Sequence, residues 1–77
     1  MEKVYLISTC ICVKKKYSIF HFKGYFKGEK ISEVRVNEID FSVGGEYLMK
    51  IYAKGVEKNI LFGDIVKVKR LNEFISY

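Results

Sequence analysis

Hydrophobic and polar residues alternate along most of this chain, in segments of about ten residues that end at short lysine-rich or glycine-containing stretches. Those stretches are residues 14–16, 28–29, 44–45 and 55–58. The segments between them are rich in Val, Ile, Tyr and Phe, which favour β-strands. No segment repeats apolar residues at helical spacing over three turns. The pattern therefore predicts an all-β protein with five strands.

Side chains at odd and even positions of a strand point to opposite faces of the sheet. The polarity of each group therefore indicates whether its face contacts the core or solvent. In the first predicted strand, residues 4–13, both sets are apolar, which predicts a central strand or one covered on both faces. In the second, Phe20, Phe22, Gly24 and Phe26 share one face, and we expect that face to point into the core.

The third predicted strand spans residues 30–41, and its alternation slips after Val36. Ile39 and Phe41 have the opposite parity to the apolar residues before them. A bulge or bend near residues 37–38 explains the slip, since bulges are how small barrels turn corners. A short helical turn there is the alternative.

The last two predicted strands also alternate. The fifth begins near residue 59, is interrupted at residues 63–64, and resumes with Val66 and Val68 expected to point inwards. We expect residues 70–77 to end this strand or to form a short closing segment. The residues of the fourth strand expected to point inwards are Tyr47, Met49, Ile51 and Ala53.

A five-stranded sheet in so short a chain would leave two edges open to aggregation, and closure into a barrel removes them. We therefore expect a closed or partly open antiparallel barrel. Residues 44–51 (GGEYLMKI) and 61–69 (LFGDIVKVK) resemble the glycine-led, alternating strands of the oligonucleotide/oligosaccharide-binding (OB) fold. The resemblance is architectural, covers most of the chain, and implies an OB-like barrel. Because no clear helix is expected between the third and fourth strands, an SH3-like barrel is the alternative.

The composition suits one small domain spanning residues 1–77, because 49% of the residues are hydrophobic. The formal net charge of +5 favours association with nucleic acid, an anionic membrane or an acidic protein.

The N-terminal segment and its two cysteines indicate the compartment. Residues 4–13 are too short to span a bilayer, and a single lysine beside Glu2 makes a weak export signal. Cys10 and Cys12 are neighbours on one face of one strand, which suits free thiols better than a disulfide. We therefore expect a cytoplasmic protein with no membrane contact. An export or lipoprotein signal is the alternative for this segment.

Residues that could carry chemistry are few. His21 is the only histidine and has no neighbouring nucleophile in the sequence, and Glu38 with Asp40 is interpreted as a solvated bend rather than a cation site. Residues 44–45 lack the lysine and hydroxyl pattern of a phosphate-binding loop. We therefore predict a non-enzymatic protein with no catalytic residue, no metal ligand and no cofactor.

Lysine and aromatic residues alternate on the faces expected to point to solvent. On such a face rings stack on bases while lysines bind phosphates, so the pattern predicts binding of single-stranded nucleic acid without strong sequence preference. The candidate residues are Tyr17, His21, Lys23, Tyr25, Lys50, Tyr52, Lys54, Lys67 and Lys69, with Lys14, Lys15 and Lys16 at the rim.

Lysine and tyrosine are also ordinary residues for the solvated side of a sheet. The second hypothesis is therefore a protein-interaction module, either a homodimer or an accessory subunit. In this hypothesis a partner covers the apolar face of the first strand, which carries Val4, Leu6, Cys10 and Cys12.

Overall fold

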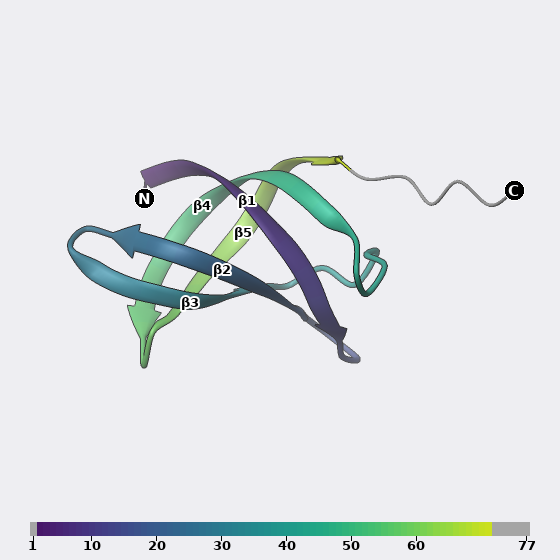
Figure 1. Cartoon of the computed structure of the whole chain (residues 1–77), viewed down its shortest axis with the longest axis horizontal. Coiled ribbons are helices and arrows are strands. Elements are labelled where there is room, and N and C mark those ends of the chain that lie inside the picture. The colour runs from purple at the N-terminus through teal and green to yellow at the C-terminus, as the bar shows by residue number, and fades with distance from the viewer. Residues whose placement is uncertain (1, 72–77) are drawn as a thin grey trace, which may run out of the picture.

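A computed structural model of the chain describes residues 2–71, which form five β-strands and no helix (Figure 1). The all-β prediction is confirmed. Residues 70–71 are the only described part of the expected closing segment, and residues 72–77 lie outside the described residues. Within residues 2–71, no helix is long and apolar enough to cross a membrane. The strands are β1 (Glu2–Val13), β2 (Ser18–Phe26), β3 (Glu29–Val36), β4 (Glu46–Glu57) and β5 (Ile60–Arg70).

The strands close into a barrel in the order β1-β2-β3-β5-β4, with β4 returning to β1. Neighbouring strands are antiparallel except β3 and β5, which run parallel where residues 33–36 pair with residues 60–63. A parallel pair needs a crossover connection, here made through β4, so the sheet is not a simple meander. The prediction of a closed or partly open five-stranded barrel is confirmed, with one parallel pair where only antiparallel pairs were expected.

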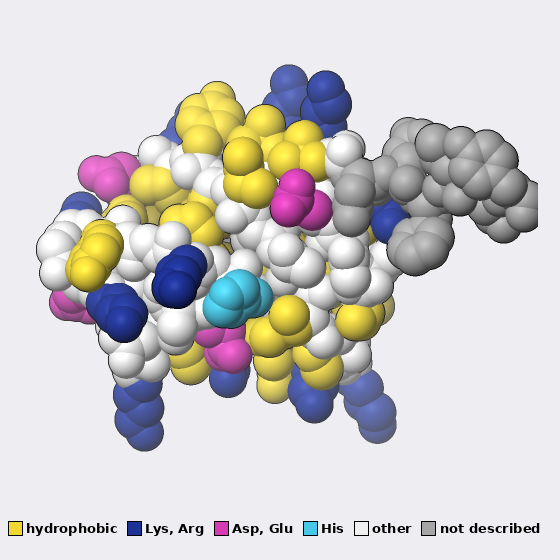
Figure 2. Space-filling view, viewed as in Figure 1, with side chains coloured by type: hydrophobic (Ala, Val, Ile, Leu, Met, Phe, Trp, Pro, Cys, Tyr) yellow, Lys and Arg dark blue, Asp and Glu magenta, His cyan; other side chains and the backbone are white. Residues whose placement is uncertain are grey.

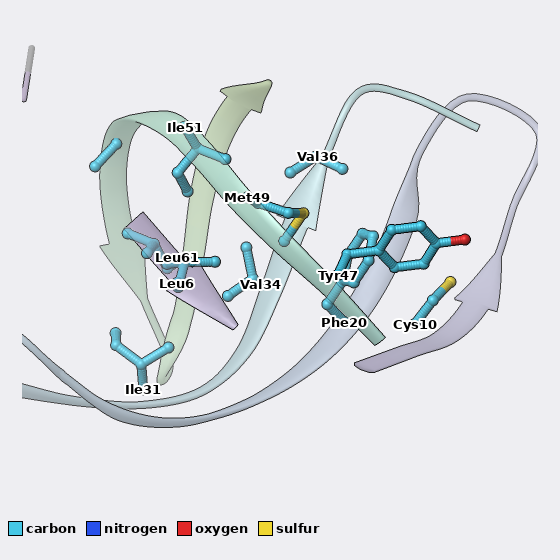
Figure 3. Packing of buried hydrophobic residues seen from close by; sticks show 11 residues of the cluster. Leu6, Cys10, Phe20, Ile31, Val34, Val36, Tyr47, Met49, Ile51 and Leu61 are labelled. Carbon is cyan, nitrogen blue, oxygen red and sulfur yellow. The ribbon is translucent and has the colours of Figure 1, made fainter. Parts of the chain in front are cut away.

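The barrel interior is filled by apolar side chains from all five strands (Figure 3). The inward alternation predicted for β4 is confirmed, and Phe20 is fully buried as expected, with Phe22 and Phe26 half-buried against the cluster. Fully burying one such large side chain stabilises the fold by about 1.5–3 kcal/mol. The cluster consists of Leu6, Cys10, Phe20, Ile31, Val34, Val36, Tyr47, Met49, Ile51, Ala53 and Leu61.

The connection between β3 and β4 differs from the prediction. A bend does fall at residue 37, but the strand ends at Val36 and the chain forms a loop rather than a strand or a helical turn. Phe41 anchors this loop, with its ring centre 4.9 Å from that of Phe20 and 5.1 Å from that of Tyr47. The Tyr47 hydroxyl also accepts a hydrogen bond from the backbone N–H of Ser42 at 3.0 Å. The slipped alternation therefore reflects a loop packed on the core.

Of the two alternatives for the first strand, the central position is confirmed, because β1 pairs with both β2 and β4, and burial on both faces is wrong. Leu6, Ser8 and Cys10 are buried in the barrel, whereas Tyr5 and Ile7 on the opposite face are 68% and 56% exposed. The face thought to need a partner's cover is thus the core face. The apolar side chains that remain exposed, such as Tyr5 and Ile7, lie on the opposite face of β1.

Val66 and Val68, both predicted to point inwards, are each 40% exposed, so neither is buried in the core. The pairing of β5 with β4 shifts between Ile65 and Lys67, which leaves Val66 bulged out of register. Val68 lies opposite the buried Met49 on β4 and so points to the inner side as predicted, but it is in the part of β5 beyond its pairing with β3. Among the described residues, nothing covers these two valines fully, so both are partly exposed to solvent.

Candidate nucleic-acid interface

The outer surfaces of β1, β4 and β5 form one continuous face, because β4 pairs with β1 on one side and with β5 on the other. Its central row runs from Tyr5 to Lys50 to Lys67, each residue opposite the next. Paired residues of antiparallel strands point to the same side of the sheet, so these three side chains project together. We call this surface the β1–β4–β5 face. Its residues are Lys3, Tyr5, Ile7, Leu48, Lys50, Tyr52, Lys67 and Lys69.

Two cross-strand pairs on this face bring a lysine against a tyrosine ring. The Lys50 ammonium lies 5.3 Å from the centre of the Tyr5 ring, and the Lys3 ammonium lies 5.3 Å from that of Tyr52. Cation–π attraction at an exposed site contributes about 0.5–1 kcal/mol. These contacts orient the lysines along the sheet surface.

A shallow groove crosses the same face and encloses about 190 Å³. Leu48 supplies apolar surface to it, Val68 of β5 also lines it, and lysines surround them. In Figure 2 hydrophobic side chains gather along the upper edge of the molecule, over β1, with Lys and Arg side chains beside them. The groove thus combines apolar contact area with positive charge. Its lining consists of Tyr5, Leu48, Lys50, Lys67, Val68 and Lys69.

The lysines at the centre of the face are not engaged in the ion pairs seen in the structure. Among residues 2–71, Arg35 pairs with Glu33 at 3.1 Å and Lys54 pairs with Asp64 at 3.4 Å. Neither pair includes Lys50 or Lys67, which lie opposite one another. Their like charges are mutually unfavourable, and an anion placed between them would relieve that repulsion.

The structure brings part of the predicted site together and separates the rest. Lys50, Tyr52, Lys67 and Lys69 lie on the β1–β4–β5 face. Lys54 follows on the outer surface of β4, at an irregularity in the pairing with β5, where it contacts Asp64.

The predicted residues of β2 lie elsewhere, since β1 separates β2 from β4 and β3 separates it from β5. His21 is exposed next to Thr9 of β1. Lys23 and Tyr25 are exposed in the part of β2 that pairs only with β3. A single surface shared by β2, β4 and β5 is therefore not present.

The remaining predicted residues lie in the loop between β1 and β2. Tyr17 is half-buried, and the Arg35 guanidinium lies 5.6 Å from the centre of its ring. Lys14, Lys15 and Lys16 are exposed. At about 3.3 Å per residue, the end of β1 that leads into this loop lies about 26 Å along the strand from Tyr5.

Sequence reasoning missed the contribution of β1 to this face, namely Lys3, Tyr5 and Ile7. A signal was present, because Lys3 and Tyr5 share the odd face of the strand with Ile7. The apolar Ile7 and Ile11 made that face look buried.

The described residues offer little for metal binding. Residues 2–71 contain no cluster of three or more His, Cys, Asp or Glu side chains placed to hold a metal ion. Cys10 and Cys12 are free thiols, and burial raises the pKa of the Cys10 thiol. A buried thiol with a raised pKa is a poor nucleophile.

Comparison with known proteins adds no family to this description: no protein-family model, no curated protein and no solved structure matches the chain. The function is therefore inferred from the geometry of the β1–β4–β5 face and from its charge.

Proposed function

We propose that this protein is a non-enzymatic module that binds single-stranded nucleic acid on its β1–β4–β5 face. One observation carries the proposal: three neighbouring strands place the exposed ring of Tyr5 beside Lys50, with Lys67 next in the same row. Stacking of a base on an aromatic side chain contributes about 1–3 kcal/mol, and lysines on either side bind the backbone phosphates. Apolar area at Ile7 and Leu48 suits bases that have been freed from a duplex.

The electrostatics favour a polyanion over a second copy of the chain. The face carries Lys3, Lys50, Lys67 and Lys69, and the whole chain has a net charge of +5. Two such faces brought together would concentrate like charges in a partly desolvated contact, which costs free energy. A nucleic-acid strand instead supplies the opposite charge and planar rings together.

Fluorescence anisotropy with a labelled single-stranded oligonucleotide, at low and moderate salt, tests the proposal. The informative comparison is Tyr5→Leu with Tyr25→Leu, because the two tyrosines are similarly exposed, at 68% and 74%, but lie on different parts of the barrel. We expect Tyr5→Leu to weaken binding by about 1–3 kcal/mol and Tyr25→Leu to leave it nearly unchanged. No binding at low salt, or equal losses in the two variants, would contradict the proposal.

We propose that the module acts in the cytoplasm. Cys10 and Cys12 are free thiols, which a reducing compartment would keep unoxidised.

A second candidate function is self-association through the apolar part of β1. The supporting observation is that Tyr5, Ile7 and Ile11 are all exposed on the outer side of that strand. Sedimentation equilibrium distinguishes the two candidates: a dimer whose affinity falls in Ile7→Lys supports self-association. A strict monomer up to high protein concentration eliminates it.

A further inference from the structure

A second hollow lies beside the β1–β4–β5 face, where β3 and β5 stop pairing. The parallel pairing of these strands ends at Val36 and Gly63, after which the chain turns away from the sheet at Asn37. The space left there is about 290 Å³. This volume is close to the lower end of ligand pockets, which span about 300–1,000 Å³. The lining residues are Tyr17, Arg35, Asn37, Lys54, Phe62 and Gly63.

The walls of this hollow suit a flat ring. Tyr17 and Phe62 supply aromatic surface, and the planar guanidinium of Arg35 is held in place on two sides. Its Nε donates a hydrogen bond to Glu33 at 3.1 Å, and its central carbon lies 5.6 Å from the centre of the Tyr17 ring. Aromatic rings and guanidinium planes are the surfaces on which unpaired bases stack. The Asn37 amide, with both donors and an acceptor, is suited to contacting a base edge.

The charges around the hollow indicate whether the base or the phosphate of a nucleotide binds there. Each of the two cations lining the hollow already has a carboxylate partner, Glu33 for Arg35 and Asp64 for Lys54. The hollow is therefore close to neutral, in contrast to the lysine-rich face beside it. A phosphate gains little from a cation that is already neutralised, whereas an uncharged base with a polar edge does not need free charge.

The two sites are joined along β4. Lys50, Tyr52 and Lys54 follow one another on the outer surface of that strand, and Lys54 lines the hollow. From Lys50 to Lys54 the strand rises about 13 Å. A single strand of nucleic acid held by the lysines of the β1–β4–β5 face can thus extend along β4 into the hollow.

We infer that this hollow, lined by Tyr17, Arg35, Asn37 and Phe62, receives one base of the bound strand and makes the affinity depend on the identity of that base. The inference rests on the proposed nucleic-acid binding and adds to it a specific position. It replaces the expectation of binding without sequence preference by preference at one nucleotide.

The test measures affinities for dA, dC and dT homopolymers of equal length at one salt concentration, for the unchanged chain and for two variants. We expect the unchanged chain to distinguish the best from the worst homopolymer by about fivefold or more, the low end of what one paired base edge contributes. Asn37→Ala, a change at an exposed residue, should reduce that ratio towards one. Lys67→Ala on the β1–β4–β5 face should weaken all three affinities by a similar factor and preserve the ratio.

An independent measurement follows the amide chemical shifts of labelled protein titrated with a thymidine dinucleotide. Shifts at Asn37 and Gly63 support the inference, and shifts confined to β1 and the lysine row of β4 contradict it. Equal affinity for the three homopolymers, or an unchanged ratio in Asn37→Ala, also overturns the base-binding hollow while leaving the proposed function standing. If no oligonucleotide binds at low salt, the proposed function fails together with the inference.

Discussion

Lys50 on β4 and Tyr5 on β1 are direct cross-strand partners, and the Lys50 ammonium lies 5.3 Å from the centre of the Tyr5 ring. On the other side of Lys50, β5 places Lys67 in the same row. A ring and two ammonium groups from three separate segments therefore share one strip of surface. This arrangement is the basis of the proposed nucleic-acid contact.

Replacing two lysines of this strip should reduce the salt dependence of binding. Each lysine that no longer neutralises a phosphate lowers the slope of log affinity against log salt by about 0.7 for a single strand. Lys50→Gln with Lys67→Gln should thus lower the slope by about 1.4, measured by anisotropy at four or more salt concentrations. The matched control is Lys23→Gln with Lys30→Gln, which removes the same charge from exposed positions on β2 and β3. An equal decrease of the slope in the two double variants would show that binding depends on net charge alone.

Gly63→Ala should destabilise the barrel by about 1–3 kcal/mol, the usual range for overpacking a core. A Cβ at this position would stand 2.7 Å from both Ile51 Cδ1 and the Tyr52 carbonyl oxygen. Gly55→Ala is the control, because nothing lies within 4 Å of a Cβ there, and its effect should stay within about 0.5 kcal/mol. Urea unfolding of both variants measures the difference. A Gly63→Ala protein as stable as Gly55→Ala would contradict the close packing of β5 against β4.

Phe41→Ala should cost about 2 kcal/mol of unfolding free energy, less than the 3–5 kcal/mol of a fully buried phenylalanine. The reason is that the half-buried ring of Phe41 packs edge-to-face on Phe20 and Tyr47 and holds the loop after β3 against the core. Val43→Ala in the same loop serves as the control, since Val43 is exposed and should matter little. Thermal or urea unfolding provides the measurement. Equal stabilities would mean that the loop does not contribute to the core.

The stability of the protein should fall at alkaline pH in part through Cys10. Burial raises the pKa of this thiol above its ordinary value of 9.0, so the unfolded chain, whose thiol keeps that ordinary value, loses the proton first. The protonated Cys10 thiol therefore contributes fully to the stability of the fold below the pKa of the unfolded chain. This contribution is lost as the pH rises through the higher pKa of the folded state. Unfolding free energies at about pH 7 and about pH 10 should differ more for the unchanged chain than for Cys10→Ala. An identical pH dependence in the two proteins would show that Cys10 makes no such contribution.

Much of the barrel could be predicted from local pattern. The alternation of Tyr47, Met49 and Ile51 identified the inward face of β4, because a strand with one polar and one apolar side has only one favourable orientation. The same reasoning failed for Val66, which is bulged out of register, whereas Val68 does share the side of the buried Met49. A one-residue shift in the pairing of β5 is not visible in the hydrophobic pattern of β5 alone.

The candidate site was predictable only in part, for a related reason. Lys50 and Lys67 were identified as outward-facing from their own strands, but the sequence could not show that they are neighbours. The sequence pattern also placed Tyr25 of β2 on the same face as these lysines, although β1 lies between β2 and β4. Tyr5 was left out, because an apolar face that contacts solvent has the same sequence pattern as one that contacts a core.

The order of hydrophobic and polar residues by itself determined that this chain forms β-strands, how many there are, and which residues of β4 enter the core. These properties depend on neighbours along the chain and on the two-residue period of a strand. Only the tertiary structure decided that β4 lies between β1 and β5, and hence that Tyr5, Lys50 and Lys67 share one surface. Strand order and register come from contacts between residues far apart in the sequence, so the local pattern of any one segment does not contain them.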